Sequence, residues 1–333
     1  MSKIKPSKGA PYARVMGVGG YRPVRVVPNE VIIETIDSSD EWIRSRSGIA
    51  TRHWASPEES VAAMSVEAAG KAIADAGITP EQIGAVVIAT VSHFKQTPAI
   101  ATEIADRIGA GRPAAFDISA ACAGFVYGLT LAKGMVVEGS AEHVLVVGVE
   151  RLSDLTDRED RATAFLFGDG AGAVVVGPAK EPRMGPTVWG SEGDKSETIK
   201  QTVPWDAYHS GPQEKFPAIT QEGQAVFRWA VYEMAKVAQQ ALDAAGITPE
   251  ELDVFIPHQA NMRIIDSMVK TLKLPESVAV ARDVENTGNT SAASIPLAME
   301  RMLATGQAKS GDTALVIGFG AGLVYAATVV TLP

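Results

Sequence analysis

The sequence predicts an α/β protein with a mainly parallel central sheet. Along most of the chain, short β-branched runs alternate with alanine-rich amphipathic segments, which is typical of strands and helices that wind a parallel sheet. The later half of the chain also repeats local sequences of the earlier half in the same order. Together these observations predict a duplicated α/β unit whose two halves pack about a pseudo-twofold axis.

Composition limits the classes of function. The 333 residues carry a formal net charge of −9, which argues against nucleic-acid binding, because that usually needs a basic face. A hydrophobic content of 46% with 21% charged residues is typical of a globular protein with a large core. No stretch approaches the roughly 18 uninterrupted apolar residues of a membrane span, and the charged start does not resemble a signal peptide. With a single cysteine, no internal disulfide framework exists, so we expect a soluble, cytoplasmic protein.

The first half is expected to alternate helices with buried strands. Hydroxyl caps and early acids at Ser38–Asp40 indicate a helix start, and Gly77 is a typical residue after a helix end. The β-branched run at 83–90 suits a strand buried on both faces. The other expected elements are a strand over 12–20, helices over 65–77 and 98–109, a strand ending at 114–118, an apolar helix over 123–137, a strand over 143–149, and a glycine-rich turn into a strand over 167–176.

Residues 178–222 interrupt the alternation. They are rich in proline, glycine and polar side chains, and we expect loops with edge strands there. A boundary near residue 180 divides the chain into an N-terminal half, 1–180, and a C-terminal half, 181–333. Alternation resumes with a long helix over 227–246 and a strand over 254–256.

Three pairs of matching segments carry the duplication. Residues 72–83 match 241–252 at an offset of 169 (246 − 77), Ser119–Cys122 match Ser291–Ser294 at an offset of 172, and Gly168–Gly172 match Gly318–Gly322 at an offset of 150. Any one match could arise by chance, but three in order predict a duplication. Two such halves would leave a site at their junction.

Cys122, the only cysteine, lies where a predicted strand turns into a helix. The first N–H groups of a helix have no internal partners and carry the positive end of its dipole. We therefore expect a thiol placed there to lose its proton more easily and to act as a nucleophile. The alternative is a buried, inert cysteine. A catalytic role needs a distant histidine and an asparagine or aspartate.

His258 and Asn289 are the candidate partners. His258 follows the predicted strand over 254–256, at the usual site edge of an open α/β sheet. Asn289 lies in the turn before the helix that repeats the one after Cys122, so pseudo-symmetry would make this turn face Cys122. Taken singly, a packed histidine and a helix N-cap would explain both residues. Their joint placement favours catalysis.

Four segments resemble the motifs of the β-ketoacyl-acyl carrier protein synthase III family, the initiating condensing enzymes of bacterial type II fatty-acid synthesis. They are Ala120–Phe125, Phe167–Gly172, Pro257–Asn261 and Gly288–Ser294, and the likeness runs from about residue 12 to residue 330. The resemblance implies the thiolase fold, with two duplicated halves forming a layered αβαβα core. It also implies a cytoplasmic homodimer that needs no metal or other cofactor, because the CoA thioester is a substrate.

The implied reaction has two stages. Cys122 takes the acyl group of a short-chain acyl-CoA, and malonyl-acyl carrier protein then decarboxylates and attacks the acyl-Cys to give a 3-oxoacyl product. His258 and Asn289 would stabilise the enolate as neutral donors. The backbone N–H groups of Cys122 and of the turn Gly320–Ala321–Gly322 would stabilise the tetrahedral intermediate, and Ala321 departs from the family's usual Gly-Gly-Gly.

The resemblance also implies binding residues. They are Trp42 and Arg161 beside the CoA adenine, Arg46 at its phosphates, Gly223, Phe227 and Asn261 along the pantetheine tunnel, and a carrier-protein patch of Arg228, Arg263, Lys270 and Lys273. Thr97 would close the acyl pocket of the partner subunit, at the position of a Phe in the acetyl-specific form. The smaller Thr97 side chain predicts that branched four- and five-carbon acyl groups are accepted besides acetyl.

Alternatives fit less well. A papain-like protease has a Cys-Gly-Ser-Cys-Trp segment, which this chain lacks. Elongating synthases use two histidines, degradative thiolases use a second cysteine, and plant-type polyketide synthases are longer. A non-catalytic CoA-binding module would lose the Cys-His-Asn set. A starter-unit synthase of a polyketide or other secondary pathway stays open as the alternative function.

Overall fold

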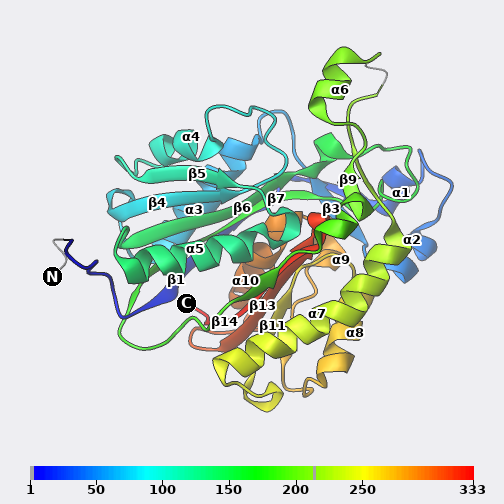
Figure 1. Ribbon diagram of the computed structural model, residues 1–333. Helices are drawn as coiled ribbons and strands as arrows, with labels where there is room; N and C mark the ends of the chain where they lie inside the picture. Colours follow the sequence, from blue (N-terminus) through cyan, green and yellow to red (C-terminus); the bar gives the residue numbers. More distant parts are fainter. Residues whose placement is uncertain (1–3, 213–214) are drawn as a thin grey trace.

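The computed structural model describes residues 4–212 and 215–333, and its core is built on two five-stranded sheets (Figure 1). The strand orders are β1-β7-β6-β4-β5 and β8-β14-β13-β11-β12. In each sheet two of the four strand pairings are parallel and two are antiparallel, so four strands run in one direction and only β7 or β14 runs in the other. The sheets are therefore mixed rather than purely parallel, because β6–β7 and β13–β14 are consecutive antiparallel pairs without a crossover helix.

The first sheet takes its strands from residues 12–179. They are β1 (Tyr12–Tyr21), β4 (Ile83–Ala89), β5 (Ala114–Ile118), β6 (His143–Arg151) and β7 (Asp169–Ala179), with a separate pair of β2 (Arg25–Pro28) and β3 (Thr51–Trp54). The helices of this part are α1 (Asn29–Ile32), α2 (Asp40–Ser47), α3 (Val61–Asp75), α4 (Ile100–Arg107) and α5 (Gly124–Glu138), with 3₁₀ turns η1 (Pro80–Gln82), η2 (Ala121–Ala123) and η3 (Leu152–Leu155).

The second sheet takes its strands from residues 188–331. They are β8 (Val188–Gly190), β11 (Val254–Pro257), β12 (Ala279–Val280), β13 (Thr313–Gly320) and β14 (Val324–Thr331), with a separate pair of β9 (Ile199–Gln201) and β10 (Ile219–Gln221). The helices are α6 (Trp205–Ser210), α7 (Gly223–Ala245), α8 (Met262–Leu272), α9 (Val284–Thr287) and α10 (Ser294–Ala304), with 3₁₀ turns η4 (Gly193–Thr198), η5 (Pro249–Glu251), η6 (Ser291–Ala293) and η7 (Ala321–Leu323).

The layers follow the predicted αβαβα order (Figure 1). Helices α5 and α10 lie between the two sheets and contribute Phe125, Leu129 and Met299 to one fully buried apolar cluster. Helices α3 and α4 cover the outer face of the first sheet, and α7 and α8 cover the outer face of the second. Among the described helices, one segment, Ala121–Glu138, has the length and apolar composition of a membrane span. It includes α5, the helix that packs between the two sheets.

The duplication is visible element by element. In chain order, α3, η1, β4, α4, β5, η2, α5, β6 and β7 recur as α7, η5, β11, α8, β12, η6, α10, β13 and β14. The first matched pair is confirmed at its offset of 169, because both copies end in a capping box, Thr79–Gln82 and Thr248–Glu251.

The second and third matched pairs are out of register. Ala121 and Ser291 both have positive φ, +44° and +48°, at the first position of η2 and η6, so the structural offset is 291 − 121 = 170 rather than 172. Cys122 therefore corresponds to Ala292 and not to Ser294. Gly168–Gly172 enter β7, whereas the segment beginning at Gly318 ends β13. Small residues recur wherever two backbones pack closely, so short Ala/Gly matches slip easily.

Helix boundaries differ from the prediction where capping groups come from elsewhere. Helix α3 begins four residues early, since Ser60 accepts a hydrogen bond from the N–H of Ala63. Helix α4 begins only at Ile100, because the Asp117 carboxylate on β5 accepts the N–H groups of Ile100 and Ala101. Helix α7 begins at Gly223 rather than residue 227, and the irregular stretch 178–222 contains short strands as expected, together with α6.

Close backbone contacts hold the two halves together, and they make one stability prediction. A Cβ on Gly148 of β6 would lie 2.1 Å from the Ala292 carbonyl oxygen in η6, whereas a Cβ on Gly70 of α3 would meet nothing within 4 Å. We expect Gly148→Ala to destabilise the protein by about 1–3 kcal/mol through overpacking, and Gly70→Ala to stabilise it by up to about 1 kcal/mol through helix propensity. Urea unfolding measures both, and a Gly148→Ala variant as stable as Gly70→Ala would contradict the packing described.

Candidate active site

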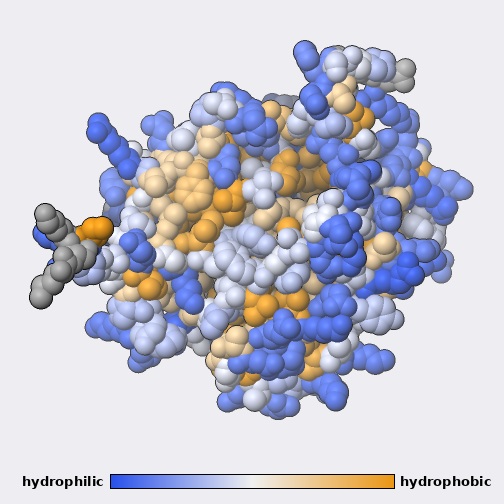
Figure 2. Space-filling view, in the orientation of Figure 1, coloured by the Kyte–Doolittle hydropathy of each residue, from blue (hydrophilic) through white to orange (hydrophobic). Residues whose placement is uncertain are grey.

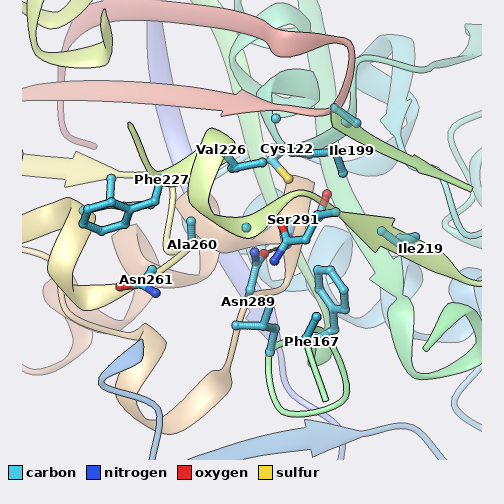
Figure 3. Close-up of a pocket in the computed structure, with 18 of the residues that line it drawn as sticks. Cys122, Phe167, Ile199, Ile219, Val226, Phe227, Ala260, Asn261, Asn289 and Ser291 are labelled. Atoms are coloured by element: carbon cyan, nitrogen blue, oxygen red, sulfur yellow. Dashed lines mark hydrogen bonds between the residues drawn. The ribbon is translucent and has the colours of Figure 1, made fainter. Parts of the chain in front are cut away.

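A cavity of about 820 Å³ opens at the junction of the two halves. Cys122 from η2, His258 after β11 and Asn289 before η6 all line it, although they are far apart in the sequence (Figure 3). Gly320 and Ala321 at the end of β13 line the same cavity. The structure therefore brings together the predicted nucleophile, the two predicted donors and the predicted oxyanion turn.

Cys122 is held against a glycine. A Cβ on Gly320 would lie 2.9 Å from the Cys122 nitrogen and 3.0 Å from its Sγ, so position 320 has no room for a side chain. Gly322, the third residue of the turn, has φ +79° but is not among the residues lining the cavity. Ala121, just before Cys122, has a positive φ of +44°, which is unusual for a residue other than glycine.

The thiol is less acidic than its position in the sequence suggests. Cys122 lies in the 3₁₀ turn η2, and α5 begins two residues later, at Gly124, so Cys122 is not at the N-terminus of the α-helix. Although the residue is partly exposed at the cavity wall, the surrounding protein removes water and raises the pKa of the thiol to about 12. The expectation of an easily deprotonated thiol is therefore wrong for this arrangement.

His258 is a neutral, oriented ring. Its exposed fraction is 2%, and burial lowers its pKa to about 3. Nδ1 lies 2.7 Å from the Ser294 hydroxyl, and that hydroxyl oxygen also accepts the N–H of Gln259 at 3.3 Å. Because the Ser294 proton then has Nδ1 as its acceptor, we assign the ring proton to Nε2. The edge of the ring packs on Phe319.

Asn289 presents its amide nitrogen. Its Oδ1 accepts the N–H of Ser291 at 2.9 Å, which leaves the amide NH₂ as a donor. The Asn289 backbone pairs with the segment that leads into β7. Its N–H donates to the Leu166 carbonyl, and its carbonyl accepts the Gly168 N–H. His258 and Asn289 therefore offer the cavity two neutral N–H donors.

Glu150 is a buried carboxylate that the sequence prediction missed. It lies near the end of β6 with no exposed surface, and Ser291 donates to its Oε1 at 3.2 Å. The one sequence signal was an acidic residue directly after the apolar run 143–149. Ser291 and Ser294 were predicted only as motif residues, although both contact the residues that carry chemistry.

The predicted CoA residues gather at one side of the cavity. Arg161 and Arg46 place their guanidinium groups 5.0 and 5.9 Å from the Trp42 ring centre. Trp42 and Arg46 line the cavity, whereas Arg161 contacts the Trp42 ring but is not among the lining residues. Trp42 also packs edge-on against Phe165.

The predicted tunnel residues Gly223, Phe227 and Asn261 all line the cavity. Asn261 caps α8 by accepting the N–H of Arg263, and its amide donates to the Arg46 carbonyl at 3.0 Å. Arg263 lies 4.8 Å from the Phe227 ring centre. This contact ties the start of α8 to the first turns of α7.

The predicted carrier-protein patch is split. Arg228 and Arg263 line the cavity, whereas Lys270 and Lys273 lie exposed at the far end of α8 and do not line it. Thr97 is exposed, outside the cavity of its own chain, so its role across an interface stays a prediction. In the described residues no group of three or more His, Cys, Asp or Glu side chains could hold a metal ion.

The chain matches two family models. The one described as "3-Oxoacyl-[acyl-carrier-protein (ACP)] synthase III" covers residues 116–193, and the one for the C-terminal part of these proteins covers 242–332. The chain is 83% identical over 333 residues to "Beta-ketoacyl-[acyl-carrier-protein] synthase III" of Streptomyces glaucescens, with 100% of both chains covered. It is 52% identical to the mycobacterial β-ketoacyl-acyl carrier protein synthase III of Mycobacterium marinum, with 100% of this chain and 99% of that one covered.

Solved structures agree with this similarity. The priming β-ketosynthase of the R1128 polyketide biosynthetic pathway superposes with a TM-score of 0.97 at 45% identity, covering 100% of this chain and 99% of that chain. The 3-oxoacyl-(acyl carrier protein) synthase III of Pseudomonas aeruginosa PAO1 superposes with a TM-score of 0.91 at 36% identity, covering 97% and 98%. The predicted thiolase-type fold and the predicted family are confirmed.

The Ser294 contact makes a testable prediction about His258. We expect the His258 ring to be neutral throughout the ordinary pH range with its proton on Nε2, because burial lowers its pKa to about 3 and Ser294 donates to Nδ1. Nitrogen NMR of histidine-labelled protein distinguishes the two tautomers, and Ser294→Ala should remove the preference. A ring that titrates near the ordinary histidine pKa of about 6.5, or that carries its proton on Nδ1, would contradict the assignment.

Proposed function

Because the chain belongs to the β-ketoacyl-acyl carrier protein synthase III family, we propose that it catalyses the initiating condensation of fatty-acid synthesis. It joins the acyl group of a short-chain acyl-CoA to malonyl-acyl carrier protein, with loss of CO₂, and gives 3-oxoacyl-acyl carrier protein. The observation that carries this proposal is the convergence of Cys122, His258, Asn289 and Gly320 on one cavity.

In the first stage Cys122 attacks the thioester carbonyl and the CoA thiol leaves. Thioester exchange suits a soft sulfur nucleophile and a thiol leaving group. The oxygen of the tetrahedral intermediate develops negative charge, and backbone N–H groups of Cys122, Gly320 and Ala321 are the proposed donors to it. The close packing of Gly320 on Cys122 supports this, since it brings the backbone of the β13 turn beside the sulfur.

In the second stage the malonyl group loses CO₂ and its carbanion attacks the acyl-Cys. Decarboxylation builds negative charge on the thioester oxygen. His258 Nε2–H and the Asn289 amide N–H are the proposed donors to that oxygen. Both are neutral, and both are held from behind, by Ser294 and by the Ser291 N–H, so they stabilise the enolate without themselves giving up a proton.

The cavity mouth fits a nucleotide with a long arm. Trp42 and Arg161 are the proposed contacts of the adenine, Arg46 contacts the phosphates, and Gly223, Phe227 and Asn261 line the path of the pantetheine arm. The mutual contacts of Trp42, Arg46 and Arg161 support this assignment. Arg228 and Arg263 are the proposed first contacts of the acidic carrier protein, with Lys270 and Lys273 extending the patch along α8.

The active enzyme is proposed to be a cytoplasmic homodimer. Strand β5 is an edge strand of the first sheet, and pairing with a second copy would continue the sheet and remove the edge. Figure 2 shows an apolar surface over β5 and α5. These two elements carry the partly buried apolar side chains Phe116, Ile118 and Tyr127. In such a dimer Thr97 of one subunit would reach the acyl pocket of its partner.

A starter-unit synthase of a polyketide pathway is the second candidate. The specific observation in its favour is the TM-score of 0.97 with the R1128 priming β-ketosynthase. Both functions share the acyl-Cys chemistry and differ in the carrier protein that receives the acyl group. Competition between the carrier proteins of the two pathways, with malonyl groups attached, would separate them.

The acylation proposal predicts one covalent adduct. Incubation with acetyl- or isobutyryl-CoA should add a single acyl mass to the intact protein, because Cys122 is the only cysteine. Mass spectrometry measures this directly, and Cys122→Ser is the matched control. An acyl adduct on the Cys122→Ser variant would contradict the assignment of Cys122 as the nucleophile.

The decarboxylation proposal predicts that the two stages can be separated. His258→Ala and Asn289→Ala should still load an acyl group, yet lose condensation by about 10²–10³-fold, the usual effect of removing one donor to a developing oxyanion. Release of CO₂ from malonyl-acyl carrier protein measures the second stage. The roles are reversed if either variant fails to load but decarboxylates normally.

The pocket proposal predicts a broad acyl preference. Thr97 is several atoms smaller than Phe, and each methyl group accommodated would gain roughly 0.8 kcal/mol, so branched four- and five-carbon acyl-CoA should load alongside acetyl-CoA. Competition between isobutyryl- and acetyl-CoA for Cys122 measures the preference, and Thr97→Phe should shift it toward acetyl. An unchanged ratio in Thr97→Phe, or refusal of the branched group by the wild type, would contradict this.

A further inference from the structure

Glu150 is a buried carboxylate to which the two-stage mechanism assigns no task. Its side chain has no exposed surface, and no salt bridge in the described part of the chain includes it. A buried charge without a cation is costly to fold around. Such a group beside an active site is a candidate for a function.

Neutral donors surround the Glu150 carboxylate. Ser92 Oγ lies 2.6 Å from Oε2, Val91 N lies 3.1 Å from Oε2, and Ser291 Oγ lies 3.2 Å from Oε1. These bonds favour the ionised form, but burial outweighs them and raises the pKa of Glu150 to about 7. The carboxylate is therefore built to exchange a proton close to neutral pH.

Ser291 connects Glu150 to the nucleophile. Its hydroxyl donates to Glu150 Oε1 at 3.2 Å, and its interaction with the thiol lowers the pKa of Cys122. Both residues line the same cavity, and Figure 3 shows the Cys122 sulfur pointing toward Ser291. Ser291 adopts φ +48°, a strained value for a residue other than glycine, and its N–H is fixed by Asn289 Oδ1. One hydroxyl can accept the thiol proton and donate its own to a carboxylate at the same time.

We propose that Glu150 is a positioning residue that accepts the thiol proton of Cys122 through the Ser291 hydroxyl. As the Cys122 sulfur attacks the acyl-CoA carbonyl, its S–H bond breaks and the proton moves to Ser291 Oγ, while the Ser291 proton moves to Glu150 Oε1. The proton leaves during the attack, so no free thiolate accumulates, and Glu150 becomes a neutral carboxylic acid. The expelled CoA sulfur takes a proton and leaves as the thiol, and Glu150 gives up its proton and returns to the carboxylate. This role rests on the proposed function of Cys122 as the acylated nucleophile.

The transfer keeps the charge of the buried site constant. A single negative charge moves from the carboxylate to the developing oxyanion, so no second charge is created in a poorly solvated region. From the other elements, Thr90, Val91 and Ser92 after β4 face Glu150 without charge, and the residue opposite on β7 is Gly170. Arg151 is paired with Asp154, and His258 is neutral. Cys122 is the titratable group coupled to Glu150, so measured pKa values belong to the pair.

Alkylation of Cys122 by iodoacetamide tests this without any acyl-CoA substrate, so its outcome is independent of the proposed function. With one cysteine in the chain, intact mass reports the rate at one site. In the wild type the rate should rise as Glu150 ionises near pH 7 and then level off. In Glu150→Gln and in Ser291→Ala the rise in alkylation rate near pH 7 should disappear. The alkylation rate at neutral pH should fall by about 10²-fold, the usual contribution of a general base.

The sign of the effect decides between the proposal and a purely structural carboxylate. If Glu150 only repels the thiolate, Glu150→Gln should alkylate as fast as the wild type or faster at neutral pH, and that result overturns the proposal. Asp169→Asn is the matched control, because Asp169 is also a buried carboxylate, bonded by Ala55 and Ser153 rather than Ser291. It should keep the wild-type pH profile. Ser291→Ala retains Glu150 and decides the matter if Glu150→Gln does not fold.

Discussion

The contact between Gly320 and Cys122 is the constraint on which the site depends. Because position 320 has no room for a Cβ, the backbone of the second half touches the nucleophile of the first. The same holds on the other side of the junction, where Gly148 packs on the Ala292 carbonyl. Burial of the side chains at this junction raises the pKa of Cys122, lowers that of His258 and raises that of Glu150. The chemistry is therefore arranged around neutral donors.

The duplication explains how one site obtains its different groups. Turns η2 and η6 occupy equivalent places, each beginning with a residue of positive φ. The first turn supplies Cys122, and the second supplies Ser291 and is flanked by Asn289 and Ser294. Pseudo-symmetry thus brings the two turns together, and their sequences have diverged. One turn carries the nucleophile, and the other carries or adjoins the residues that orient His258 and stabilise the enolate.

Much of the fold could be predicted because its signals are local. Alternating patterns identified the strands and helices, and the repeat at 72–83 and 241–252 located the duplication. Cys122, His258 and Asn289 were recognisable because each follows or precedes an identifiable element. The register of the other repeats was not predictable, since alanine and glycine match wherever backbones pack closely. The start of α4 depends on Asp117, seventeen residues after Ile100 in the chain.

The electrostatics of the site could not be predicted from sequence for a physical reason. A helix dipole can be inferred locally, but desolvation of Cys122 depends on which distant backbone covers it. Glu150 and Ser294 were missed for the same cause, since their partners Ser291 and His258 lie 141 and 36 residues away. Buried polar contacts between distant segments leave almost no local pattern.

The most direct test of this account is the ionisation of Cys122 in the resting enzyme. Ultraviolet absorbance of the thiolate can be followed against pH, with Cys122→Ser subtracted as the reference. The account predicts no thiolate absorbance at neutral pH and ionisation only well above the ordinary thiol pKa of about 8.5, because desolvation raises the pKa of Cys122. A thiol that ionises below neutral pH would contradict the claim that burial at the junction controls the chemistry.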